Sequence, residues 1–284
     1  MFIHRILSAD FINPELPPDE FILKFIMIIF PTYKTYGRNL SSGGRLISLD
    51  FYRGLIMVLL MLESSRLYEH LLEGTKGSFL EPVIGQFFHH PWHGLHFWDL
   101  IQPGFMFIAG VAMAYSIYKQ RVNGVLWKNQ ANKALRRSGW LFFWGVLDYA
   151  VRGDHLSFEL WDVLTQLSFT MLVAFFIFNW KTRYQILFSV GLLLLTELLY
   201  RYSGVPCFDQ PFTDQHNFGN YVDMLLMHKI NPGGWVAINC IPNAAHTIWG
   251  AVAGKWLIKL KEDKSRITRI LIFGVVALAS VYFL

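Results

Sequence analysis

Charged residues are scarce in this chain of 284 residues. They account for only 16% of the sequence, whereas 54% of the residues are hydrophobic and 17% are aromatic. Soluble domains carry about 25% charged residues, so this composition excludes an ordinary soluble domain and indicates a membrane protein. The sequence also contains no internal repeat, no low-complexity tract and no stretch with the composition of a separate soluble domain.

Cysteine is scarce as well, with only Cys207 and Cys240. These two thiols can form one disulfide in an oxidising periplasm, and two buried thiols are the alternative. A zinc signature is missing, because the histidines between 89 and 96 fit no common ligand spacing and no second ligand cluster follows them. We therefore expect no metal.

The N-terminal segment lacks the features of a signal peptide. FILKFIMIIF at 21–30 is apolar for only about ten residues, contains Lys24 and is not followed by a small-residue cleavage site. We expect 1–44 to be a cytoplasmic or interfacial leader and 45–284 to form the membrane domain. The last apolar run stops with the chain at Leu284, which predicts that this domain is truncated at its C-terminus.

Apolar runs approach the length of about 20 residues that a helix needs to cross a bilayer. The sequence therefore predicts an all-α fold, a polytopic transmembrane bundle of about seven helices. The predicted spans are 48–66, 99–118, 136–151, 160–180, 184–201, 235–258 and 270–284.

Lysine and arginine alternate between the connections. Nineteen lie in 1–45, 119–137, 181–183 and 255–269, whereas five lie in the other connections. The positive-inside rule then places the N-terminus in the cytoplasm and the connections 67–98, 152–159 and 202–234 outside. The pI of about 9.1 reflects this topology, so no nucleic-acid partner is expected.

Eight of the ten histidines fall on the predicted outer side, and four of them lie in the stretch FHHPWHGLHFWDLIQPGFMFIAG at 88–110. Asp99 lies where the next helix begins, so it is either a capping residue or the partner that orients a catalytic histidine. The histidines alone do not indicate which of them would act as a base. The other interpretation of this stretch is a wet interfacial loop rich in His and Trp.

Polar residues interrupt three of the predicted spans. Asp50 and Arg53 share one face of the first, and Glu63 and Arg66 lie three residues apart near its other end. The fourth begins with Asp162, Thr165 and Gln166. In the sixth, Asn239, Asn243 and His246 share one face, and Pro242 is expected to interrupt the backbone ladder beside them. Such polar faces indicate either an interior pathway or hydrogen bonds between helices. Small residues around Gly110 predict close helix packing.

Four motifs resemble, in order, the heparan-alpha-glucosaminide N-acetyltransferase family and its bacterial relatives, over about 45–284. They are SLDFYRG at 48–54, HHPWHGLHFWDLIQPGFMFIAG at 89–110, DVLTQLSFTML at 162–172 and NPGGWVAINCIPNAAHTIWGAVAGK at 231–255. The resemblance implies a multi-pass enzyme of the bacterial inner membrane. Such an enzyme moves an acetyl group from cytoplasmic acetyl-CoA, its co-substrate, to an amino sugar or glycan outside.

The resemblance also implies roles for individual residues. Trp92 and Gly94 set the register, so His89 stands where the family has its catalytic histidine, with His90 as an adjacent competitor and Asp99 as the matching aspartate. The histidine would act either as a general base or as the acyl acceptor. The acetyl-CoA contacts would come from polar residues of the first, fourth and sixth spans: Asp50, Arg53, Ser64, Gln166, Asn243 and His246. Basic residues of 119–137 would attract the CoA phosphates.

The sequence departs from the family at several points. Ser64 beside Glu63 replaces an asparagine, Asn231 replaces an aspartate ahead of the sixth span, and further C-terminal helices are missing. The alternatives to the enzyme are a transporter or export partner for an acylated glycan, and an inactive fragment of the enzyme. The expected partners are the acceptor glycan, the lipid bilayer and, in a homodimer, a second copy of the chain.

Overall fold

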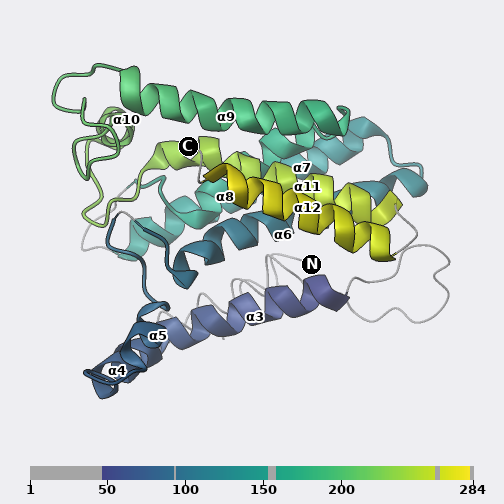
Figure 1. Cartoon of the computed structure of the whole chain (residues 1–284). Helices are drawn as coiled ribbons and strands as arrows, with labels where there is room; N and C mark the ends of the chain where they lie inside the picture. The colour runs from purple at the N-terminus through teal and green to yellow at the C-terminus, as the bar shows by residue number, and fades with distance from the viewer. Residues whose placement is uncertain (1–46, 93, 153–157, 260–262, 282–284) are drawn as a thin grey trace, which may run out of the picture. The chain divides into compact units, whose positions relative to one another are not determined.

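A computed structural model describes residues 47–92, 94–152, 158–259 and 263–281, and every regular element in these ranges is a helix (Figure 1). The predicted leader at 1–44 lies outside them, as do His93 and His155. The elements are α3 (Ile47–Ser64), α4 (Leu67–Gly74), α5 (Glu81–Gly85), the 3-10 helix η2 (Phe97–Leu100), α6 (Ile101–Val122), α7 (Trp127–Arg152), α8 (Val163–Phe176), α9 (Thr182–Tyr202), α10 (Phe218–Met227), the 3-10 helix η3 (Ala237–Asn239), α11 (Cys240–Lys259) and α12 (Asp263–Val281).

The chain divides into two compact units. Unit 1 comprises Met1–His90 and Leu95–Trp98, and unit 2 comprises Pro91–Gly94 and Asp99–Leu284. In unit 1, the chain beyond α5 folds back, because the Trp98 amide donates to the Gln86 carbonyl (3.0 Å). The buried ring of Tyr68 stacks on Phe87 at 4.8 Å and meets Trp98 edge-on at 5.5 Å. Tyr68 also donates to the Leu59 carbonyl of α3 (3.2 Å), so an aromatic cluster joins the end of α3 to α4.

Helix α11 is the central element of unit 2. It packs against α6, α8 and α9, while α7 packs against α8 (Figure 1). Glycines allow the α6–α11 contact, because a Cβ atom at Gly110 would lie 2.1 Å from the Thr247 carbonyl oxygen and one at Gly250 would lie 1.9 Å from that of Phe107. Small residues that let two backbones approach are the usual basis of helix packing in membranes, and the packing predicted at Gly110 is confirmed.

Within the described ranges, two helical stretches are long and apolar enough to cross a membrane by length and composition, Phe97–Val122 and Thr182–Tyr202. In α9, side chains such as Leu187 (67% exposed) and Leu198 (55%) leave a large apolar surface uncovered, which requires an apolar environment or a partner. The other predicted spans form helices that do not meet the same test. Charged or amide residues divide α3 and α11, the first third of α7 is polar, and α8 has only 14 residues.

The helices differ from the prediction in three places. Pro242 does not interrupt a helix, because α11 begins at Cys240 and a proline in the first turn removes no intrahelical hydrogen bond. The first predicted span, 48–66, ends early, since α3 ends at Ser64, and Arg66 lies beyond it with a φ of 58° and pairs with Glu69 at 2.9 Å. The predicted outer connections also contain helices of their own, α4, α5 and α10.

Cys207 and Cys240 are both free thiols.

Candidate functional site

Unit 1 holds the histidine pair predicted to be catalytic. His89 is exposed and His90 half-buried in the segment that follows α5. The His90 ring meets that of His96 edge-on at 4.8 Å, and the His96 ring nitrogen Nδ1 lies 2.9 Å from the Phe88 carbonyl oxygen. The carboxyl group of Glu63 interacts electrostatically with His89 and through a hydrogen bond with Trp98. An accessible histidine beside a carboxylate is an arrangement in which the histidine can take up a proton.

Three further predicted residues lie on α3. Asp50 and Arg53 interact electrostatically, as their spacing on one helix face predicted. Ser64 is the last residue of this helix and is half-buried. Asp99 falls in unit 2, within η2, and the N-cap position of α6 is taken by Leu100. That Asp99 orients a histidine therefore stays a prediction.

In unit 2 the predicted residues Gln166 and Asn243 meet in a network of amide side chains. Asn243 Nδ2 donates to Gln166 Oε1 (2.7 Å), and Gln102 Nε2 donates to the same oxygen (3.1 Å). Gln166 Nε2 in turn donates to the Trp161 carbonyl (3.1 Å). Gln166 is only 1% exposed, whereas Gln102 and Asn243 are half-buried. Three helices thus bring one buried and two accessible amides together.

His246 lies one turn beyond Asn243 on α11. Its ring meets Trp249 edge-on at 5.5 Å and interacts with the main chain of Asn243. Its Nδ1 atom is buried and makes no hydrogen bond of normal geometry to any residue in the described ranges. A buried polar atom without such a bond is costly, so this nitrogen is a candidate contact for a bound group.

Polar contacts continue along α11. Thr247 donates to Thr170 of α8 (3.0 Å), Trp249 Nε1 donates to Ser189 of α9 (2.9 Å), and Lys255 Nζ donates to Gln185 of α9 (2.9 Å). From Asn243 to Lys255 these contacts cover about 18 Å at 1.5 Å per residue. A line of polar groups therefore follows the central helix through an otherwise apolar part of unit 2.

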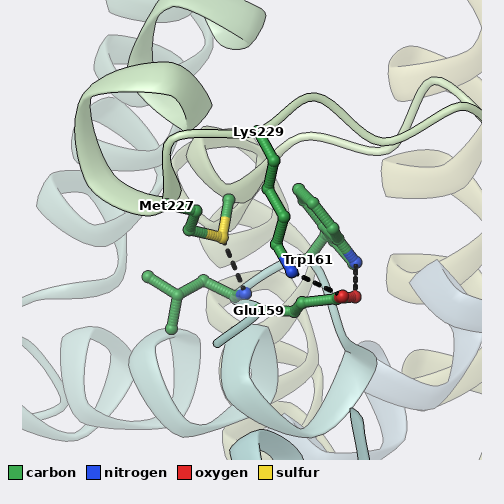
Figure 2. Close-up of polar contacts among 5 residues, drawn as sticks. Glu159, Trp161, Met227 and Lys229 are labelled. Carbon is green, nitrogen blue, oxygen red and sulfur yellow. Dashed lines mark hydrogen bonds and ion pairs between the residues drawn. The ribbon is translucent and has the colours of Figure 1, made fainter. Parts of the chain in front are cut away.

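A second polar cluster joins two of the predicted outer connections (Figure 2). Lys229 Nζ and Glu159 Oε1 form an ion pair at 2.7 Å, and the other carboxylate oxygen accepts from Trp161 Nε1 at 2.7 Å. The Lys229 ammonium also lies 5.5 Å from the centroid of the Trp161 ring. The Leu160 amide donates to Met227 Sδ at 3.2 Å. These contacts fix the entry to α8 against the end of α10.

The start of α11 is held by Asp223 of α10, which is fully buried. Its Oδ1 atom accepts from the Ala237 amide (2.9 Å), at the first residue of η3, and Oδ2 has no hydrogen-bond partner within the described ranges. Burial raises the pKa of Asp223 from 3.8 to about 7, although the Ala237 hydrogen bond acts in the opposite direction. This carboxyl group therefore titrates near neutral pH.

The departure from the family motif at Asn231 has a structural equivalent. Asn231 Oδ1 accepts a hydrogen bond from the Gly233 amide (2.7 Å) and so closes a turn. An aspartate side chain at this position would make the same turn. Gly234 has a φ of 78°, and a Cβ atom there would lie 2.5 Å from the ring of Trp92. Trp92 Nε1 donates to the Phe212 carbonyl (2.6 Å). Residues from two of the quoted motifs therefore lie side by side in unit 2.

Several members of these clusters were not predicted. Gln102 lies within the quoted stretch as the one amide in the first turn of α6, a signal that was visible in the sequence. No local signal identified the partners of the other three residues, because the sequence places them in predicted outer connections that have no periodic pattern. These residues are Glu159, Lys229 and Asp223.

No family model matches the chain, and no curated protein matches it.

Proposed function

We propose that the chain is a multi-pass membrane acyltransferase that moves an acetyl group from acetyl-CoA to an amino sugar or glycan. In this proposal the N-terminus lies in the cytoplasm of a bacterial cell, and the acceptor lies on the outer side. The observation that carries it is the network of Gln102, Gln166 and Asn243. The pantetheine arm of CoA contains two amide groups, which need hydrogen-bond partners when they enter an apolar bundle.

The chemistry requires a base near the acceptor. The amine nitrogen attacks the thioester carbonyl, the carbon–sulfur bond breaks, CoA leaves as a thiolate, and a proton must leave the nitrogen. His89 is exposed and interacts with Glu63, so it is the residue we assign to this proton transfer. It can instead accept the acetyl group first and pass it to the amine.

The test is acetyl-CoA consumption by purified protein with glucosamine as acceptor. We expect His89→Ala to lower turnover by about 10² to 10⁴, the usual contribution of a general base. His70→Ala is the matched control, because His70 is exposed on α4 of the same unit. Equal activity of His89→Ala and the native protein would refute the assignment, and His90→Ala decides between the two neighbours.

The line of polar contacts along α11 also favours a second candidate, a transporter for an acylated glycan, because polar groups line permeation paths. A transporter moves its substrate across vesicles without consuming acetyl-CoA. Acetyl-CoA turnover in detergent, where the protein has no two sides, would exclude transport as the source of activity. Vesicle uptake without turnover would overturn the enzyme proposal.

A further inference from the structure

A cluster of cations surrounds the connection between α8 and α9. Lys255 Nζ of α11 donates to the Phe178 carbonyl and to Gln185 Oε1. Gln185 is fully buried and is itself held by a hydrogen bond from its Nε2 atom to the Ile177 carbonyl (2.9 Å). Two fixed acceptors therefore orient the Lys255 ammonium, which has three donor hydrogens in all.

Arg121, at the end of α6, reaches the same connection. Its guanidinium donates to Asn179 and lies 5.5 Å from the centroid of the Phe178 ring, while the Lys255 ammonium lies 4.3 Å from that centroid. Lys259 follows Lys255 by four residues on α11, and both Lys259 and Arg121 repel the Lys255 charge. Two positive charges thus lie beside one aromatic ring, and Lys259 is close enough to Lys255 to repel it.

No carboxylate in the described part of the chain lies within ion-pair distance of Arg121, Lys255 or Lys259. The ends of α6 and α11 attract cations through their helix dipoles, but each dipole is equivalent to only about half a charge. Counting only the residues that the structure describes, the cluster therefore keeps a net positive charge that a bound anion would neutralise.

The surroundings indicate which anion. Trp180 (47% exposed) lies on the same connection and Tyr184 (47%) in the first turn of α9, and such aromatic residues mark the membrane–water interface. The exposed apolar surface of α9 begins directly beyond them, at Leu187. Basic clusters between helices at this depth bind anionic lipid headgroups.

We propose that Arg121, Lys255 and Lys259 bind the phosphate of an anionic phospholipid, whose acyl chains lie along α9. Arginine offers paired donors to phosphate oxygens and lysine offers a point charge. The phosphates of CoA present the same chemistry, so the test must separate the two sources.

The experiment titrates short-chain phosphatidylglycerol into the detergent-solubilised chain and follows thermal unfolding. For the double variant Arg121→Gln with Lys255→Met, we expect the half-saturating lipid concentration to rise about 30-fold, because each lost cation weakens binding roughly fivefold. The control, Lys181→Gln with Arg183→Gln, also removes two positive charges, at the N-cap and in the first turn of α9, and is expected to stay within about twofold. A specific site would be refuted if lipid binding weakens equally in both double variants, or if it weakens in neither of them.

Two further arms complete the test. Arg121→Gln alone changes an exposed side chain and keeps the Lys255 contacts, so its loss of binding cannot be assigned to misfolding. We expect a rise of about fivefold for this variant, and an unchanged value would refute the role of Arg121. Titration with CoA replaces the lipid in the second arm. The lipid proposal would be overturned if CoA stabilises the native chain, the double variant loses that stabilisation, and the native chain does not respond to lipid. The site would then be assigned to the nucleotide.

Discussion

Replacing Asp223 by asparagine tests how strongly one buried carboxyl group controls the start of α11. The side chain is fully buried, and its pKa is raised from 3.8 to about 7. A raised pKa stabilises the fold at low pH, because the folded state keeps a proton that the unfolded state releases. This stabilisation is complete below about pH 4, falls as the pH rises, and is lost above about pH 7.

The size of the effect follows from the shift. One pKa unit corresponds to about 1.4 kcal/mol, so the range from pH 5 to pH 7 covers about 3 kcal/mol as an upper limit. The asparagine side chain of the variant has an amide oxygen that can still accept from the Ala237 amide, and it does not titrate. We therefore expect the native protein to lose stability relative to Asp223→Asn between pH 5 and pH 8, by at most about 3 kcal/mol or roughly 6 °C in Tm.

The assay is thermal unfolding in detergent, followed by circular dichroism at several pH values between 5 and 8. Asp209→Asn is the matched control, because Asp209 is exposed in the same predicted outer connection. The control variant is expected to follow the pH dependence of the native protein. The reasoning is refuted if Asp223→Asn follows it too, since Asp223 would then not be the titrating group.

Two further perturbations probe the packing of unit 2. Gly250→Ala is expected to cost about 1–3 kcal/mol of unfolding free energy, because the new Cβ atom would lie 1.9 Å from the Phe107 carbonyl oxygen. Gly191→Ala, which meets no atom within 4 Å, should cost nothing in the same unfolding assay, and equal losses would contradict the close α6–α11 contact. A double-mutant cycle with Glu159→Gln and Lys229→Met should give a coupling energy of about 0.5–1 kcal/mol, because both side chains are partly exposed. A coupling energy of zero would show that this ion pair does not join the two connections.

Much of the helical architecture was predictable because its signals are local. Apolar runs gave helices near their predicted positions, such as α9 at Thr182–Tyr202 against a prediction of 184–201. The polar residues Gln166 and Asn243 stood out because they interrupt apolar runs. In the part of the chain that the structure describes, two helices meet the length and composition test for a membrane span, and the number of spans stays a prediction.

The tertiary structure decided what depends on contacts between distant segments. The sequence by itself determined the apolar helices, the asymmetry of lysine and arginine and the interrupting polar residues, since each depends only on composition and periodicity. The partners of those residues, such as Gln102 with Gln166, and the burial of Asp223 depend on how helices pack. That packing brings together residues far apart in the chain, where periodicity carries no information.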